Sequence, residues 1–313
     1  MSEFAQVDVA FSEQSLFVLN AILAGMIFGV SLKLTTADFV RVIRQPRAPI
    51  AGLLAQFVVL PAATCVFTAL LGVQPELALG MILVASCPGG SFSNVMTFLA
   101  KASVPVSVSM TAISSLAAIV MTPLNFTLYG WLNPHTRPLL REISLDPLEL
   151  LALVGLVLVL PLILGMAIGR RHPALAERAD KPMRIITLLV FLLFVAIAFS
   201  QNFDNFVQYA GVILVLVAAH NIGALAIGNL CGRLLKLPLA ERRAVTLEVG
   251  IQNTALGLSI IFTFFPQAGG MMLIAGFWSF WHLIAGLTLA LIWSRHSPPR
   301  TSLTTTTESA HER

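Results

Sequence analysis

Apolar residues in this chain are gathered into blocks of about twenty, the length that a helix needs to cross the hydrocarbon core of a bilayer. The blocks contain no period-two alternation, which argues against a transmembrane barrel. Only 11% of the 313 residues are charged, whereas a soluble domain carries about a quarter. We therefore expect an all-α polytopic membrane protein. The nine transmembrane helices predicted from the blocks are 14–32, 48–71, 76–100, 104–130, 149–169, 184–201, 209–234, 240–265 and 270–294.

The cysteines and the net charge exclude several other classes of protein. Cys65, Cys87 and Cys231 are widely spaced and form no CxxC or Cys/His cluster, so neither a disulfide framework nor a zinc site is indicated. The formal charge of +4 is explained by orientation in a membrane and does not predict nucleic-acid binding. We expect no cofactor, no nucleic acid and no obligate protein partner.

The basic residues predict how the chain is oriented. With the N-terminus outside, all but two of the 19 basic residues lie in inside connections or in the tail, and only Arg137 and Arg141 lie outside. The inside connections include Arg178 and Arg243. We therefore expect a multi-pass protein of the cell inner (plasma) membrane with a cytoplasmic C-terminus. Residues 1–313 form a single transmembrane domain in this prediction, and residues 296–313 are a disordered cytoplasmic tail.

The third predicted helix, 76–100, is interrupted near its middle. Pro88 removes a backbone donor and Gly89-Gly90 weakens the helix further. Such a break is tolerated in a membrane only inside the protein or beside a water-filled cavity. A simple proline kink is the alternative. The side chains expected to cap a second half-helix are Ser91, Ser93 and Asn94.

The eighth predicted helix, 240–265, carries an acidic residue at mid-span. Of the 15 acidic residues, only Glu248 lies deep within a predicted helix, where an ionised carboxylate costs about 2.5–3.5 kcal/mol. Structural pairing with a buried base is the alternative, and only His220 and His282 could provide one. A bound cation is the preferred partner. Polar and flexible residues weaken the helix at the same place: Gly250, Gln252 and Asn253.

The two interrupted helices occupy corresponding positions in two halves of the chain. Each is second from the end of its half, and the predicted topology gives them opposite directions. Interrupted helices in inverted repeats form the binding sites of secondary transporters near the membrane midplane. The sequence therefore predicts an inverted repeat of four and five helices that lacks the first helix.

Oxygen-bearing side chains near the two breaks predict a hard-cation site. Ser107 and Thr111 share one face of the fourth predicted helix, with Ser109 between them, and Gln56 is a lone amide in the second. One carboxylate with many neutral oxygens suits sodium better than a divalent ion. Each hydroxyl taken alone is explained by bonding to its own helix. The N-termini of the half-helices favour an anionic substrate.

Several stretches of the chain resemble the bile acid:sodium symporter family. They are Gly80–Lys101, Val106–Thr111, Glu248–Asn253, Trp281-His282 and Leu54–Phe57 with Pro61. The resemblance implies sodium-coupled import of a small organic anion by an elevator-like motion of a core domain against a panel domain. The broken helices would cross in the core. The core would comprise about 48–130 and 209–294, and the panel about 14–32, 149–169 and 184–201.

The resemblance also implies roles for individual residues. The implied ligands of one sodium ion are Ser93, Asn94, Ser107, Thr111 and Glu248. The implied ligands of a second are Gln56, Glu248, Gln252 and the carbonyls of Val249 and Ile251. The implied substrate contacts are Ser91, Asn253 and His282. Ser91 stands where a threonine is usual, and Leu283 stands where some relatives have asparagine, which removes an amide from the expected cavity.

Other functions compete with this one. In a proton-coupled carrier or exporter of arsenite or auxin type, Glu248 would alternate between protonated and ionised forms. A channel, receptor or membrane enzyme is less favoured, because no sensory domain, repeated polar ring or nucleophile–base pair is recognisable. The expected partners are sodium, the organic anion and the lipid bilayer. Pantoate, 2-oxo acids, steroid-like acids and sulfated compounds all remain open as substrates.

Overall fold

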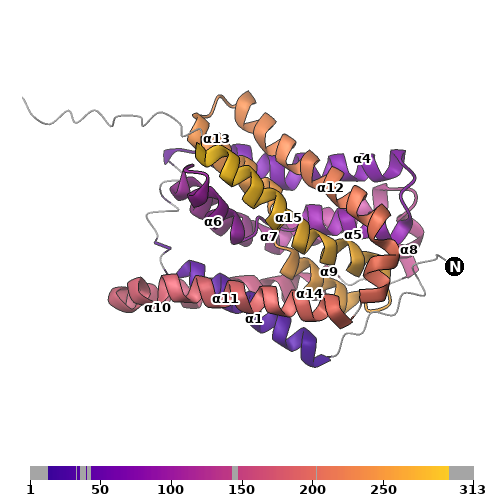
Figure 1. Ribbon diagram of the computed structural model, residues 1–313, viewed down its shortest axis with the longest axis horizontal. Coiled ribbons are helices and arrows are strands. Elements are labelled where there is room, and N and C mark those ends of the chain that lie inside the picture. The colour runs from indigo at the N-terminus through magenta and orange to yellow at the C-terminus, as the bar shows by residue number, and fades with distance from the viewer. Residues whose placement is uncertain are drawn as a thin grey trace, which may run out of the picture.

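The computed structural model describes residues 13–32, 34–35, 40, 44–142, 147–201 and 203–295. The predicted tail, 296–313, lies outside them. Helices make up most of this structure (Figure 1). In chain order they are α1 (Glu13–Ser31), α3 (Arg47–Leu54), η2 (Ala55–Val59), α4 (Leu60–Leu70), α5 (Pro75–Ser86), α6 (Phe92–Leu99), α7 (Val104–Leu132), α8 (Arg137–Glu142), α9 (Pro147–Val154), η3 (Gly155–Val159), α10 (Leu160–Arg171), α11 (Pro173–Gln201), α12 (Phe203–Leu234), α13 (Leu239–Gly250), α14 (Thr254–Phe264) and α15 (Gly269–Arg295).

The all-helical prediction is confirmed within the described residues, and a helix occupies each of the nine predicted ranges. Among the described residues, five helical stretches are long and apolar enough to cross a membrane by length and composition. They are Arg47–Leu70, Val104–Leu132, Leu148–Arg171, Val207–Leu234 and Gly269–Arg295. The count of nine transmembrane crossings stays a prediction.

Some boundaries predicted from hydropathy were wrong. Helix α11 begins at Pro173, eleven residues before the predicted start, so Arg178 lies on a helix and not in a connection. Charged residues are compatible with the first turns of a helix, and proline is favoured at its first position. Arg243 likewise lies on α13 and is buried. It donates to the carbonyl of Trp293 and stacks over the Trp293 ring, so its charge stays partnered inside the protein.

Two prolines inside long helices account for the π-helical turns η2 and η3. Pro61 and Pro161 each follow one of these turns by two residues. A proline has no N–H for the carbonyl four residues earlier, and π-turns accommodate such defects. For Pro61 that carbonyl belongs to Phe57, and the side chain of Asn125 on α7 donates to it over 2.8 Å. The distortion is therefore satisfied by a neighbouring helix, as burial in a membrane requires.

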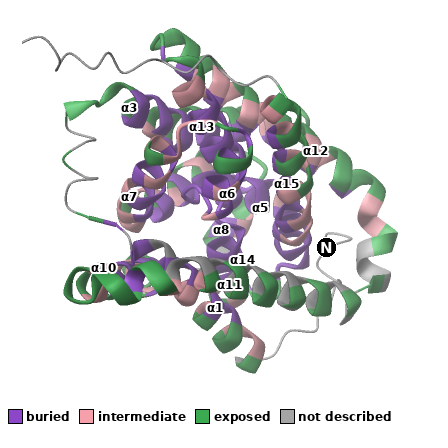
Figure 2. Cartoon of the chain, turned by 60° about the vertical axis from the view of Figure 1, so that its left-hand side comes forward, coloured by how far each residue is buried: buried purple, intermediate pink, exposed green. Residues whose placement is uncertain are grey.

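Helices α1, α10 and α11 pack against one another and lie together along one side of the molecule in both views (Figures 1 and 2). Gly165 and Gly169 of α10 allow α1 to approach closely, because a side chain at either would overlap Ser31 or the Leu32 carbonyl. Small residues spaced by four are a common device for helix packing in membranes. This layer contacts the remaining helices through α14, where Ser259 donates to Asn20 over 2.6 Å.

Burial is concentrated in the interrupted helices. Residues 77–90 and 243–256 are buried throughout, whereas exposed side chains cover the outer faces of α10 and α11 (Figure 2). Many exposed side chains are large and apolar, among them Leu70, Phe98 and Val215. An apolar outer surface around a polar interior is the arrangement expected of a protein in lipid.

Candidate functional site

The two helix breaks lie against each other at the centre of the molecule. Gly90 donates its N–H to the carbonyl of Ile251 over 2.7 Å, and Asn253 donates its N–H to the carbonyl of Pro88 over 2.9 Å. These bonds form a short antiparallel bridge centred on Gly89 and Gln252. The predicted break in each segment is confirmed, and the two breaks are hydrogen-bonded to each other.

The double glycine is needed because other groups approach its backbone very closely. A Cβ added to Gly89 would overlap the Glu248 carboxylate, and one added to Gly90 would lie 2.8 Å from the Gln252 carbonyl oxygen. Glu248 and Gln252 are both buried, so neither can move into solvent to make room for an added Cβ. The glycines therefore serve close approach as well as weakening of the helix.

Three carbonyls at the ends of α5 and α13 have a donor from another helix. Thr122 of α7 donates to the Ser86 carbonyl over 2.8 Å. Gln56 donates to the Cys87 carbonyl over 2.6 Å. Asn221 of α12 donates to the Gly250 carbonyl over 2.7 Å. Sequence reasoning missed Thr122 and Asn221, because a single polar residue in an apolar helix does not reveal its partner.

Glu248 is 1% exposed and accepts hydrogen bonds from three hydroxyls. Ser93 donates over 2.5 Å, Thr111 over 2.8 Å and Ser107 over 3.3 Å. These hydroxyls come from α6 and α7, so one carboxylate on α13 joins three helices. The prediction that Ser107 and Thr111 act from one helix face is consistent with this geometry.

Asn94 completes the cluster around Glu248. Its side-chain oxygen lies 2.8 Å from the Ser107 hydroxyl and 3.3 Å from the Thr111 hydroxyl, and each of these hydroxyls has one proton to share between Asn94 and Glu248. The prediction that Ser91, Ser93 and Asn94 cap α6 was wrong, because none makes a side-chain cap bond there. The Ser93 hydroxyl and the Asn94 side-chain oxygen bond to tertiary partners in place of the local backbone, and Ser91 lines a cavity. The Asn94 amide nitrogen is buried and has no partner among the described residues.

Five oxygen-bearing residues are therefore gathered in one buried cluster: Ser93, Asn94, Ser107, Thr111 and Glu248. One carboxylate among neutral oxygens, closed off from solvent, is a donor set that fits a monovalent hard cation. Hydroxyl groups can rotate to present lone pairs to an ion.

A second group of polar side chains surrounds Gln56 in the π-turn η2. Its amide nitrogen also donates to the side-chain oxygen of Gln252 over 2.7 Å, and Gln252 donates to the Val249 carbonyl over 2.7 Å. The side-chain oxygen of Gln56 is buried and has no partner among the described residues. The carbonyl of Ile251, the residue before Gln252, accepts from Gly90 in the bridge. Hydrogen bonds thus link Gln56, Gln252 and the Val249 carbonyl, whereas the contacts of the Ile251 carbonyl and of Glu248 with this group stay predictions.

The three residues implied for substrate contact line one small cavity. Ser91, Asn253 and His282 share its wall with Leu23 and Met26 of α1. Its volume of about 10 Å³ admits about one water molecule. Asn253 also caps α14, since its side-chain oxygen accepts from the Leu256 N–H over 3.1 Å.

The two buried histidines are not paired with Glu248. His220 shares a hydrogen bond of 2.8 Å with Thr64, and its ring meets the Trp278 ring edge-on at 4.6 Å. Both ring nitrogens of His282 have no partner within the described structure. Structural pairing of Glu248 with a buried base, the alternative left open by the sequence, therefore finds no support in this geometry.

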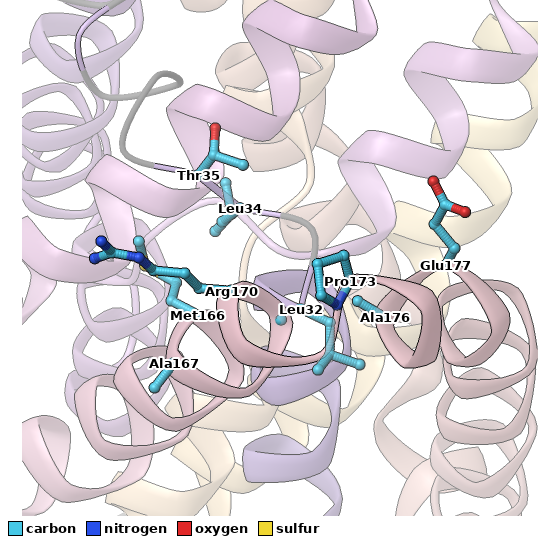
Figure 3. A pocket seen from close by; sticks show the side chains of 10 residues that line it. Leu32, Leu34, Thr35, Met166, Ala167, Arg170, Pro173, Ala176 and Glu177 are labelled. Carbon is cyan, nitrogen blue, oxygen red and sulfur yellow. The ribbon is translucent and has the colours of Figure 1, made fainter.

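A larger cavity, of about 720 Å³, lies where α1 ends and α10 meets α11. Figure 3 shows apolar side chains such as Leu32 and Met166 in its wall, with Arg170 and Glu177 extending away from each other. Its described lining contains none of the predicted ligands. Volume alone therefore does not identify the functional site, and the polar clusters at the breaks are the better candidate.

Comparison with known proteins shows that the chain is similar to sodium-dependent transporters. Residues 21–209 match the Sodium Bile acid symporter family. The uncharacterized sodium-dependent transporter YocS of Bacillus subtilis is 31% identical over 92% of this chain and 88% of its own. The probable chloroplastic sodium/metabolite cotransporter BASS1 of Arabidopsis thaliana is 30% identical over 86% of this chain and 65% of its own. The ileal sodium/bile acid cotransporter of Mus musculus is 26% identical, over 80% and 70% respectively. All three are transporters, not enzymes.

Proposed function

Because this chain belongs to the Sodium Bile acid symporter family, we propose that it is a sodium-coupled symporter that imports a small organic anion by alternating access. The observation that carries the proposal is the buried carboxylate of Glu248, which joins both broken helices through hydroxyls. A carboxylate closed off from solvent is costly unless a cation or proton accompanies it.

Two sodium sites are proposed at the breaks. The first ion would be held by the Glu248 cluster of Ser93, Asn94, Ser107, Thr111 and Glu248 itself. The second would be held by Gln56, Glu248, Gln252 and the carbonyls of Val249 and Ile251. The unpartnered oxygen of Gln56 supports the second site, because a buried acceptor without a donor is satisfied by a cation.

Coupling between ion and substrate follows from the contact between the breaks. Sodium at the Glu248 cluster would tie α13 to α6 and α7. The backbone bonds of Gly90 and Asn253 would then transmit that order to the N-termini of α6 and α14, beside the small cavity. Substrate would bind best after the ions, which is the differential affinity that coupled transport requires.

The substrate is proposed to bind where Ser91, Asn253 and His282 face α1. Both unpartnered nitrogens of His282 provide a polar group for a carboxylate. The cavity admits only about one water in this conformation, so the substrate would enter only when α1 and the breaks move apart. That motion corresponds to a core domain moving against a panel that contains α1, α10 and α11.

The inverted repeat and the nine crossings belong to the same proposal. Helices α5 and α13 have 12 residues each, begin at Pro75 and directly after Pro238, and end at the two breaks. The equal lengths, the proline at each start and the break at each end support two related halves that would cross the membrane in opposite directions. The protein would lie in the inner membrane of the cell, with its N-terminus outside and its C-terminus in the cytoplasm.

A thermal-shift screen of carboxylates on the purified protein, in sodium and in potassium chloride, would identify the substrate. Uptake of the compound identified would then be measured in proteoliposomes. Uptake driven by an inward sodium gradient, and lost with potassium, is the expected result. A flux that follows pH and ignores sodium would instead favour the proton-coupled carrier, in which Glu248 alternates between protonation states.

A further inference from the structure

One asparagine outside the predicted ion and substrate sites contacts the second break. Asn221 lies on α12 and is 1% exposed. Its amide nitrogen donates to the carbonyl of Gly250, the last residue of α13, over 2.7 Å. A carbonyl accepts only from a donor, so the NH₂ group must face Gly250. The Asn221 amide thus holds a backbone carbonyl two residues from Glu248, and we call such an amide–carbonyl hydrogen bond at a break an amide clamp.

The same arrangement occurs at the first break. Gln56 donates to the carbonyl of Cys87 over 2.6 Å. Cys87 directly precedes Pro88, which receives the N–H of Asn253, just as Gly250 directly precedes Ile251, which receives the N–H of Gly90. The two amides therefore hold equivalent carbonyls on either side of the bridge between Gly89 and Gln252.

The two clamps differ in what else they do. Gln56 also reaches Gln252 and belongs to the second proposed ion site. The side-chain oxygen of Asn221 has no partner among the described residues, and its amide nitrogen donates to the Gly250 carbonyl. Asn221 thus fixes the backbone without belonging to either oxygen cluster.

The packing of α12 on α13 fixes the position of Asn221 relative to the Gly250 carbonyl. A Cβ at Gly228 would lie 3.0 Å from the Thr246 Cα, so the two helix backbones are in close contact. Asn221 reaches Gly250 from this fixed helix. Without its donor, the last turn of α13 would lose a bond at the place where Glu248 accepts from Thr111 and the Val249 carbonyl accepts from Gln252.

We propose that Asn221 is a positioning residue for sodium: by holding the Gly250 carbonyl, it sets the orientation of Glu248 and of the Val249 carbonyl for ion binding. The inference rests on the proposed sodium-coupled function. It predicts an effect on sodium affinity that is separate from any effect on stability, because the clamp acts on ligand geometry.

The test uses sodium alone as the probe. The melting temperature of the full-length protein is titrated with sodium chloride, with potassium chloride keeping the ionic strength constant, for the wild type and for Asn221→Leu and Asn221→Ala. Leucine keeps the branched shape of asparagine but is bulkier, and alanine is the smaller alternative in case leucine prevents folding. Asn229→Leu is the matched control, since Asn229 is a half-buried residue of the same helix with an unpartnered side-chain oxygen.

The expected result is a rise of about tenfold in the sodium concentration at half-maximal stabilisation for both Asn221 variants, since one buried hydrogen bond contributes about 1.4 kcal/mol, or a factor of ten. The control should keep the wild-type value. A lower melting temperature in both salts with an unchanged sodium midpoint would overturn the positioning role, and either folded Asn221 variant decides this. A wild type that does not respond to sodium would contradict the proposed function itself.

Discussion

Thr111 on α7 donates a hydrogen bond of 2.8 Å to the Glu248 carboxylate on α13. The same hydroxyl also contacts the carbonyl of Ser107 one turn earlier, over 3.0 Å. A threonine that would otherwise only bond back to its own helix thereby connects an unbroken helix to a broken one. Ion binding at Glu248 would act on this connection directly.

Replacing Thr111 with valine tests whether this hydroxyl takes part in sodium binding. Valine keeps the branched shape and removes the oxygen, so a ligand and a charge-assisted bond are lost. We expect the sodium concentration for half-maximal stabilisation to rise by about tenfold or more. Ser109→Ala is the control, because Ser109 is buried on the same helix and its hydroxyl has no partner in the described structure. Equal sodium affinities in the two variants would contradict the assignment.

Alanine at Gly89 should damage the site far more than alanine at another buried glycine. A Cβ at Gly89 would overlap the Glu248 carboxylate, whereas one at Gly257 would make an ordinary contact of 3.6 Å with the Cys87 sulfur. We expect Gly89→Ala to abolish the sodium-dependent shift in melting temperature and Gly257→Ala to retain it. Retained sodium response in Gly89→Ala would mean that Glu248 does not need its observed position.

The sequence was sufficient to predict the helix breaks and the residues around Glu248, because a proline, two glycines and a stranded carboxylate are costly in lipid and demand explanation. It was insufficient for Asn221 and Thr122. Each is one polar residue in an apolar helix, and its partner is a backbone carbonyl that no side-chain pattern marks. The wrong capping prediction for Asn94 has the same origin: local rules favoured the backbone, whereas tertiary contacts decided.

Close packing of α1 on α10 depends on Gly169. An alanine there would overlap the Leu32 carbonyl, so α1 would have to shift, and overpacking of this kind costs about 1–3 kcal/mol. We expect Gly169→Ala to lower the melting temperature by several degrees. Gly223→Ala, with nothing within 4 Å of the added Cβ, should leave it unchanged or slightly raised, because alanine is the better helix former. Identical melting temperatures for the two variants would contradict the packing role.

Glu76 is a buried carboxylate that stabilises the fold by joining α5 to the start of α15. It lies in the first turn of α5 and accepts the N–H of Gly270, near the start of α15, over 2.9 Å. Glu76→Ala should lower the free energy of unfolding by about 1–2 kcal/mol through loss of this cap. Glu76→Gln keeps an acceptor and should retain most of the stability. Sodium affinity should be unchanged in both, and a weakened sodium response would show that Glu76 belongs to the ion site.

The central claim is that Glu248 binds the coupling ion. Equilibrium binding of radioactive sodium to the purified protein tests it most directly, because no substrate is needed. The purified wild type should bind sodium saturably, approaching two ions per chain, and purified Glu248→Ala that is still folded should bind none. Saturable binding of equal affinity in Glu248→Ala would contradict it.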